Sequence, residues 1–298
     1  MIKDLVSVII PTFNRAHLIK RSAMSVLNQT YDNLELIIVD DGSTDNTEEV
    51  VKSIDDKRII YIKQPNQGAC AARNTGIDHA KGEFIAFQDS DDVWHDNKLE
   101  KQMETLRKTG ADLVFCPLNM FKKDKDIGLL GWDFQEGMVS ASDVLTRVGT
   151  QSLFAKENVF KDEKFDVEMP RLQDFEILIR IQNKYKIYCL NEALVDYCVQ
   201  EESISANPYK MLSAIEILLQ KYPRLYNSQK FANMIINVAA ETCNNKTKKE
   251  MVVLAHRICP SAETRFRTIT LPLLSIHFFK TLYKSIAKKM FASISFLY

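Results

Sequence analysis

The sequence predicts an α/β fold in which a mostly parallel sheet is flanked by helices, followed by a helical C-terminal region. Three observations favour this class: short apolar runs alternate with helical stretches in the first half, all nine glycines lie between Gly42 and Gly149, and residues 208–298 contain no glycine. Apolar strands separated by helices are typical of parallel sheets with crossover connections. Because glycine permits tight turns, a long segment without it is expected to be helical.

The alternation of apolar and helical patterns gives the order of the N-terminal elements. It predicts strands over 5–10, 34–39, 58–62 and 83–87, and helices over 14–29, 45–54 and 69–80. Asn14 is expected to cap the first helix, and Asp45 and Glu48 have the spacing of a capping box at the second. Ligands of such sheets bind beyond the carboxyl ends of the strands, which is where the chemistry is expected.

The C-terminal region, residues 208–298, is expected to form helices over 211–220, 229–243 and 248–258. Its last part, residues 265–298, has the pattern of a basic amphipathic helix, with two arginines, four lysines and no acidic residue, a local charge of +6. Such a helix can lie on an anionic membrane surface, where each cation contributes about 1 kcal/mol. The alternative is a helix that packs on its own protein or on a second subunit, which would make a homodimer.

The composition limits the classes of partner. The chain carries 39 Lys and Arg against 39 Asp and Glu, and this net charge of zero argues against nucleic acid binding, which needs a basic excess. No apolar run reaches the roughly 18 to 20 residues of a membrane-spanning helix, and no signal peptide is apparent. The six cysteines are scattered without a C-x-x-C pair, which argues against a zinc site or a disulfide framework. These features indicate a cytoplasmic protein.

Three acidic clusters lie where predicted strands end: Asp40-Asp41, Asp89-Ser90-Asp91-Asp92 and Asp174. These carboxylates need a cationic or hydrogen-bonding partner, and two like charges 4 Å apart cost about 4 kcal/mol at an effective dielectric near 20, a repulsion that a divalent cation would remove in the second cluster. Oxygen ligands without a nearby histidine or thiolate suit Mg²⁺ or Mn²⁺, and such sites commonly hold a substrate diphosphate through the metal. The alternative is that these aspartates form turns and cap helices.

Five segments with recognisable motifs follow one another along the chain. They are V-S-V-I-I-P-T-F-N-R at 6–15, I-I-V-D-D-G-S-T-D at 37–45, A-R-N-T-G-I at 72–77, G-E-F-I-A-F-Q-D-S-D-D-V-W at 82–94 and Q-D-F-E-I-L-I-R at 173–180. Together, over about residues 4–200, they resemble the inverting glycosyltransferases of family 2. The resemblance implies a GT-A fold over residues 1–207, with a nucleotide-sugar half over 1–110 and an acceptor half over 111–207.

The resemblance also assigns residues on the donor side. The nucleotide base is expected beside Pro11, Thr12 and Asn14. Asp41 is expected to hydrogen-bond the base, which in this family is usually uracil, and Arg73 to be the cation of the donor site, since a guanidinium can grip phosphate oxygens or stack on a base. From the residues alone, Asp41 can also form an Asx-turn into the following glycine, and Arg73 a salt bridge to Asp41 or Asp91.

The D-x-D motif of the family corresponds to Asp89 and Asp91. The resemblance makes Asp91 the direct ligand of Mn²⁺ or Mg²⁺, with Asp89 nearer the ribose or sugar and a second metal-site residue. Asp92 is expected to cap a helix that begins near Asp96. Asp96 stands where the family often has proline, and aspartate is a good N-cap.

Asp174 corresponds to the catalytic base of the family. The base takes the proton of the acceptor hydroxyl as that oxygen attacks the anomeric carbon, and the displacement inverts the configuration. The alternative is a carboxylate placed at a helix N-terminus by the helix dipole, with Arg180 as a neighbour. The sequence departs from the family at Gln173, where Glu is common, and at Gln88, where an apolar residue is common. Neither departure removes a proposed ligand or base.

The resemblance implies a metal-dependent inverting transferase. It would move a hexosyl or N-acetylhexosaminyl group from a nucleotide diphosphate, expected to be UDP, to a hydroxyl of a glycan or lipid-linked oligosaccharide in surface polysaccharide synthesis. The basic C-terminal segment favours an acceptor at the cytoplasmic face of the membrane. The Q-x-x-R-W motif of processive synthases is absent, which favours transfer of a single sugar. The rival is a catalytically silent nucleotide-sugar binding module; dehydrogenases and kinases are disfavoured because neither G-x-G-x-x-G nor G-x-x-x-x-G-K-[ST] occurs.

Overall fold

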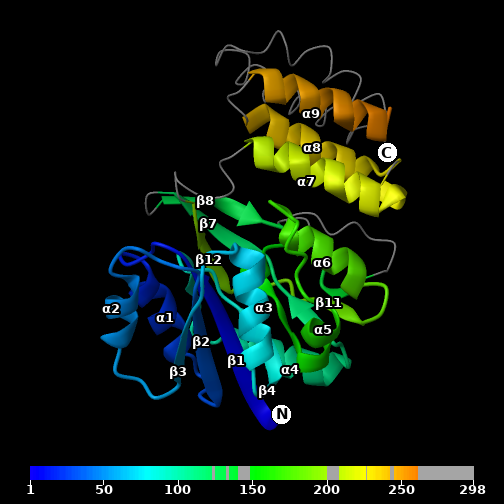
Figure 1. Ribbon diagram of the computed structural model, residues 1–298. Helices are drawn as coiled ribbons and strands as arrows, with labels where there is room; N and C mark the ends of the chain where they lie inside the picture. The colour runs from blue at the N-terminus through cyan, green and yellow to red at the C-terminus, as the bar shows by residue number, and fades with distance from the viewer. Residues whose placement is uncertain are drawn as a thin grey trace. The chain divides into compact units, whose positions relative to one another are not determined.

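The computed structural model describes residues 1–122, 125–131, 134–139, 148–199, 208–225, 227–241 and 245–260 (Figure 1). The chain divides into two compact units, Met1–Asn207 and Pro208–Tyr298. The first unit is α/β and the second is helical over its described residues. The predicted fold class is therefore confirmed.

The described part of the first unit contains an eight-stranded sheet with the order β3-β2-β1-β4-β10-β6-β11-β9. Its strands are β1 (Ile2–Thr12), β2 (Leu34–Asp40), β3 (Ile59–Lys63), β4 (Gly82–Phe87), β6 (Leu113–Phe115), β9 (Gly137–Met138), β10 (Phe154–Lys156) and β11 (Ile187–Cys189). The first four strands in sequence pair in parallel, as predicted from their apolar runs. β10 is antiparallel to both β4 and β6, so the sheet continues without a break from residues 1–110 into residues 111–207.

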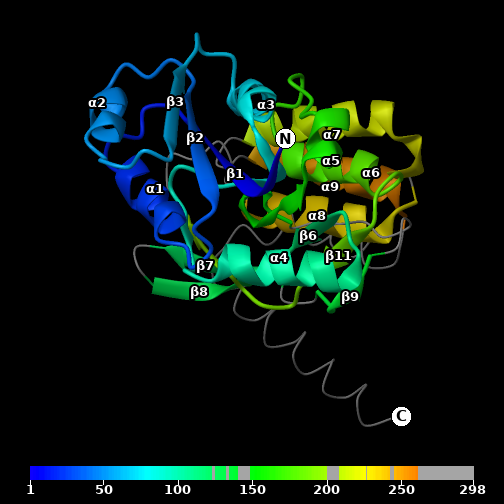
Figure 2. The same ribbon diagram turned by 90° about the horizontal axis from the view of Figure 1, so that it is seen from below.

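Helices cover both faces of this sheet (Figure 2). They are α1 (Ile19–Leu27), α2 (Thr47–Lys52), α3 (Ala69–His79), α4 (Lys98–Thr109), α5 (Glu157–Asp162) and α6 (Gln173–Ile181). Alternate residues of β1 divide between two cores: Val8 packs with α1 and α4, whereas Ile9 packs with α3, α5 and α6. Gly76 permits a close approach of α3 to β1, since an added Cβ would lie 2.4 Å from a side-chain carbon of Ile9. This approach packs the second half of α3 directly on β1.

A second sheet, which the sequence did not predict, has four described strands in the order β5-β12-β7-β8. They are β5 (Val93–Trp94), β7 (Leu118–Lys122), β8 (Lys125–Leu130) and β12 (Val195–Cys198). β12 is parallel to β7 and antiparallel to β5. The pairing brings the chain directly after the D-x-D motif against residues one hundred positions later, because Trp94 of β5 lies opposite Val195 of β12.

The second unit contains α7 (Pro208–Lys221), a 3₁₀ turn η3 (Pro223–Leu225), α8 (Gln229–Glu241) and α9 (Asn245–Ile258). These helices confirm the three predicted from spacing, within a few residues at each end. Their buried apolar residues recur at helical spacing, as in Ile215, Leu218, Ile235 and Met251. Residues 265–298, which carry the predicted amphipathic helix, lie outside the described residues. Within the described ranges, no helix is long and apolar enough to span a membrane.

The predicted start of the first helix and the predicted capping box of the second are wrong. The first helix begins at Ile19, not at Asn14, because the Asn14 side chain accepts a hydrogen bond from the backbone of Thr44 (2.9 Å) and its own φ is +52°. At α2, Asp45 accepts from the Thr47 backbone and hydroxyl as a cap would. Glu48 instead pairs with Lys52 and Lys63, so the predicted capping box does not form.

Candidate active site

The predicted site residues gather where β1, β2 and β4 end. Thr12 is the last residue of β1 and lies opposite Asp40, the last residue of β2, and the Asp41 amide donates to the Thr12 carbonyl (2.8 Å). Pro11 and Thr12 are buried, and the Thr12 hydroxyl has no partner among the described residues. A buried hydroxyl left unpaired is costly, so this edge is suited to receive a polar ligand.

Asp41 organises the loop that leads into α3. Its Oδ1 accepts from the Gln64 side chain (2.7 Å) and the Gln67 amide (2.9 Å), and its Oδ2 accepts from the Gly68 amide (2.7 Å). The suggested Asx-turn belongs to its neighbour Asp40, which accepts from the Ser43 amide at 2.7 Å. Asp41 therefore shapes the floor of the site with bonds that sequence spacing did not reveal.

Arg73 joins the two halves of the first unit. Its guanidinium donates to Asp89 (2.7 Å) and to the Gln173 side-chain oxygen (3.0 Å). The suggested salt bridge to Asp41 or Asp91 is wrong; the partner is Asp89. The residue is 5% exposed, and its Nε has no partner within the described part of the chain. A buried arginine with an unpaired donor is suited to bind an anionic group.

The three aspartates of the 89–92 cluster lie in different surroundings. Asp89 and Asp91 reach the surface, whereas Asp92 is fully buried and accepts a hydrogen bond from the Cys198 amide (2.8 Å). The expectation that Asp92 caps the next helix is wrong, and so is the same expectation for Asp96, because α4 begins at Lys98 after Asn97. Burial, followed by the charges of Asp89 and Asp91, raises the pKa of Asp92 well above its usual range.

The pair Asp89 and Asp91 fits a divalent cation. Burial, and then the charge of Asp89, raises the pKa of Asp91 to about 6, while Arg15 and Arg21 oppose the rise. A cation between the two carboxylates would relieve their repulsion. In the described residues no three His, Cys, Asp or Glu side chains form a metal-binding group. Mn²⁺ and Mg²⁺ commonly take only one or two carboxylates, with substrate phosphates supplying the other ligands.

Asp174 lies in the first turn of α6, immediately after Gln173, which receives Arg73. Its Oδ1 accepts from the Phe175 amide (2.8 Å). The residue is partly exposed, but protein atoms surround its carboxyl group, and this burial raises its pKa to about 6 against the opposing effects of the Phe175 amide and Arg73. A carboxylate with this pKa can accept a proton near neutral pH.

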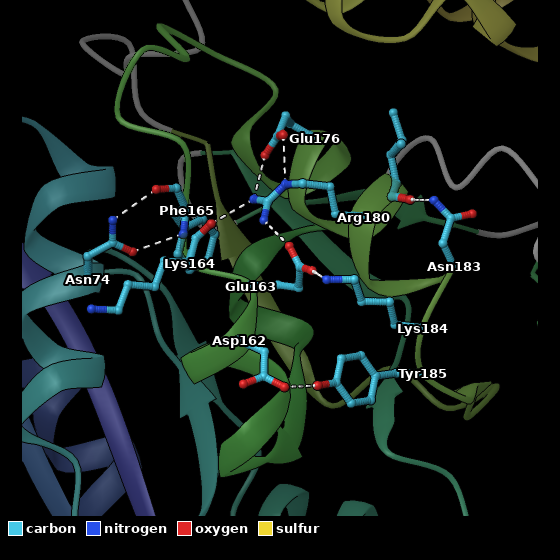
Figure 3. A network of polar contacts seen from close by, with 11 residues as sticks. Asn74, Asp162, Glu163, Lys164, Phe165, Glu176, Arg180, Asn183, Lys184 and Tyr185 are labelled. Atoms are coloured by element: carbon cyan, nitrogen blue, oxygen red, sulfur yellow. Dashed lines mark hydrogen bonds and ion pairs between the residues drawn. The ribbon is translucent and has the colours of Figure 1, made fainter.

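Arg180 is not a partner of Asp174. It forms an ion-pair network with Glu176 and Glu163, which are both buried (Figure 3). The structure therefore links Asp89, Arg73 and Gln173 by hydrogen bonds, with Asp174 the next residue in α6, and leaves Arg180 outside this group.

The family model described as Glycosyl transferase family 2 matches residues 7–164. The chain is 31% identical over 234 residues to a protein of Bacillus subtilis (strain 168) named putative teichuronic acid biosynthesis glycosyltransferase TuaG, covering 75% of this chain and 90% of the relative. It is 32% identical over 211 residues to UDP-Glc:alpha-D-GlcNAc-diphosphoundecaprenol beta-1,3-glucosyltransferase WfgD of Escherichia coli, covering 70% of this chain and 82% of the relative.

Solved structures share the fold. The crystal structure of S. aureus TarS 1-349 in complex with UDP-GlcNAc has a TM-score of 0.64 and 17% identity, covering 83% of this chain and 78% of that one. The mannosyltransferase PcManGT from Pyrobaculum calidifontis, in complex with GDP-Man and Mn²⁺, has a TM-score of 0.59 and 18% identity, covering 98% of this chain and 87% of that one.

Proposed function

Because the chain belongs to glycosyl transferase family 2, we propose that it moves a hexosyl or N-acetylhexosaminyl group from a nucleotide-diphosphate donor to a glycan hydroxyl by metal-dependent, inverting displacement. One observation carries this proposal: Arg73 contacts both Asp89 of the D-x-D motif and Gln173, the residue before Asp174. The contacts bring the proposed donor and base sides together at one edge of the sheet. The proposed catalytic domain is residues 1–207, with residues 208–298 as a helical appendage.

In the proposed mechanism the chain's own residues bind, orient and move one proton. Arg73 binds the donor diphosphate through its unpaired donor, and Asp89 and Asp91 would hold the cation. Mn²⁺ or Mg²⁺ bound there would neutralise charge on the departing diphosphate. Asp174 takes the proton of the acceptor hydroxyl as its oxygen bonds to the anomeric carbon. The bond from that carbon to the diphosphate oxygen breaks on the opposite face, which inverts the configuration.

UDP is the proposed nucleotide, held by Pro11, Thr12, Asn14 and Asp41. TarS complexes with UDP and with UDP-GlcNAc, together with the UDP-Glc specificity named for the E. coli relative, support this choice. The mannosyltransferase complex with GDP-Man shows that the same fold also accepts a guanine nucleotide. A thermal-shift panel of UDP-, GDP- and dTDP-sugars with and without Mn²⁺ tests the choice, because a bound ligand raises stability by RT ln(1 + [L]/Kd). A shift with GDP-sugars alone would contradict it.

The competing function is a silent module that binds nucleotide sugars without turnover. The panel therefore continues with hydrolysis of the donor that gives the largest shift, measured as released UDP. Slow metal-dependent hydrolysis supports the transferase, because water can replace the acceptor hydroxyl. Donor binding without hydrolysis or transfer to any glycan would support the silent module.

Turnover is expected to fall as the pH drops through about 6, because the proposed base must be ionised and the pKa of Asp174 is raised to about 6. With an aspartate of ordinary pKa as the base, turnover would not fall until the pH reached about 4. The measurement is kcat against pH at saturating Mn²⁺, which keeps Asp91 ionised. The residual rate of the Asp174→Asn variant serves as the control and is expected to lack this acid limb. The same limb in both proteins would assign it to another group.

The acceptor is proposed to be a glycan or lipid-linked oligosaccharide of surface polysaccharide synthesis, met at the cytoplasmic face of the membrane. The relatives named for teichuronic acid and diphosphoundecaprenol-linked substrates support this acceptor class. The basic composition of residues 265–298 supports peripheral membrane contact.

Deleting residues 265–298 is expected to abolish binding to anionic vesicles, since the segment carries a charge of +6, while sparing donor hydrolysis. Vesicle co-sedimentation measures the binding, and uncharged vesicles are the control. Undiminished sedimentation of the shortened chain would contradict membrane contact through this segment. A simultaneous change in solution mass from dimer to monomer would instead favour packing on a second subunit.

A further inference from the structure

The segment Glu163–Phe165, between α5 and α6, is held by polar contacts from two different helices (Figure 3). From α3, the Asn74 side chain donates to the Phe165 carbonyl (2.8 Å) and accepts from the Phe165 amide (2.9 Å). One side-chain amide thus satisfies both main-chain groups of a residue outside the sheets. Such a contact fixes backbone position as well as contributing stability.

From α6, Arg180 holds the same segment. Its Nη2 donates to the Lys164 carbonyl (2.6 Å) and its Nη1 to Glu163. Its Nε and Nη2 bind the two oxygens of Glu176 in a fork, both at 2.9 Å. Glu163 and Glu176 are 6% and 2% exposed. A planar guanidinium can serve these partners together, whereas a lysine ammonium cannot reproduce the fork.

The held segment supports the donor site through the Phe165 ring. The ring is 2% exposed, and the Arg73 guanidinium lies over it at 5.4 Å from its centroid. The ring also meets Phe87 edge-on at 5.2 Å, and Phe87 ends the strand that leads to Asp89. Since neither Asn74 nor Arg180 is placed in the donor or acceptor contacts, their effect on the site must pass through Phe165 and α6.

We infer that Asn74 and Arg180 are positioning residues that fix Arg73 and Asp174 relative to each other by gripping the Glu163–Phe165 segment. The inference rests on the proposed function. Asn74 is the neighbour of Arg73 on α3, and Arg180 lies on the same short helix as Asp174. The segment between them is the shared contact. A displacement of about 1 Å at a reacting group can cost 10²-fold in rate, so a grip of this kind has catalytic consequences.

The test compares Asn74→Ala, Asn74→Asp and Arg180→Lys with Asn183→Ala. Asn183 is the matched control, because its side-chain amide also donates to a backbone carbonyl, that of Ile179 (2.9 Å). Ile179 belongs to α6, so this contact does not involve the Glu163–Phe165 segment. Asn74→Asp keeps an acceptor for the Phe165 amide but replaces the donor with a charged oxygen that repels the Phe165 carbonyl, and Arg180→Lys keeps the charge beside the buried glutamates. These milder variants remain informative if Asn74→Ala does not fold.

Calorimetry with UDP and Mn²⁺ gives Kd and the number of binding-competent molecules, and donor hydrolysis is then expressed per competent molecule. The Asn74 variants are expected to weaken UDP binding about tenfold, and Arg180→Lys to lower turnover per competent molecule at least about tenfold. Irreversibly inactive molecules lower only the number of competent molecules and change neither quantity, and a thermal melt of each variant shows whether reversible unfolding could raise its apparent Kd. The double variant Asn74→Ala/Arg180→Lys is expected to lose less than the product of the single losses, because both act on one segment.

Values matching Asn183→Ala in both quantities would overturn the inference and make the contacts structural only. If the loss of activity in the double variant equals the product of the two single losses, the two residues do not act through one shared segment. Absence of nucleotide binding by the unchanged protein would overturn the proposed function, and this inference with it.

Discussion

Asp174→Asn is expected to lower turnover at least about a hundredfold, since a positioned base contributes 10²- to 10⁴-fold. Asparagine keeps the shape of the side chain and can still accept the hydrogen bond from the Phe175 amide, so α6 should keep its start. Arg73 contacts Gln173 and Asp89, not Asp174, so the donor site is expected to remain intact. The expected result is therefore a loss in kcat with little change in the Kd for UDP.

Single-turnover transfer and UDP calorimetry on the same preparation measure these two quantities. The control is Asp162→Asn on the neighbouring helix α5, which removes an exposed carboxylate that accepts from Tyr185. Turnover close to that of the unchanged protein would remove Asp174 from the role of base. A parallel loss of UDP affinity would place it in the donor site instead.

Asp91→Asn is expected to abolish the metal-dependent part of UDP binding. The substitution removes one of two carboxylates proposed to hold the cation, and loss of even an outer partner of a metal site typically costs 10- to 100-fold. In the free protein the same change removes a carboxylate whose pKa is raised to about 6 by burial and then by the charge of Asp89, so the fold should be unaffected or slightly more stable near pH 7. The loss of binding would then not come from unfolding.

The Kd for UDP is measured with Mn²⁺ and with a chelator, and the ratio of the two values is compared between proteins. Asp55→Asn, an exposed carboxylate after α2, is the control for the loss of one negative charge. The expected ratio is near one for Asp91→Asn and unchanged for Asp55→Asn. A ratio in Asp91→Asn equal to that of the unchanged protein would contradict the ligand assignment.

The first half of the fold could be predicted because its strands are continuous apolar runs, such as β2, in which every residue is buried. The four-stranded sheet could not, because β5 has two residues and β8 is largely exposed, so neither carries a run or an alternation long enough to read. The start of α1 was misplaced because Asn14 is a good capping residue by type. Its side chain is taken by Thr44, a contact across thirty positions.

The candidate site was predictable in its location and only partly in its roles. Parallel strands place their carboxyl ends at one edge of the sheet, and this rule predicted that the regions around Asp41 and Asp89 lie close together. The D-x-D resemblance separated Asp91 from Asp92 by role, but it did not reveal their physical difference: Asp92 is fully buried and accepts a hydrogen bond from the Cys198 amide, 106 positions away. Likewise, the contact between Arg73 and Gln173 spans one hundred positions and follows only from the assembled fold.

The antiparallel insertion of β10 between β4 and β6 also constrains how the chain folds. Phe154 lies opposite Ala86, so the edge of β4 is completed only when a strand beyond residues 88–153 has been made and returned to it. Strand pairings so distant in sequence slow folding, because the chain loses the entropy of closing the loop before the new contacts stabilise it. Until then the edge of β4 that pairs with β10, at Phe84 to Ala86, presents unpaired main-chain groups that can pair with another chain and cause aggregation. Residues 1–110 are therefore not expected to fold independently: during synthesis they remain prone to aggregation until the strand at Phe154–Lys156 has followed.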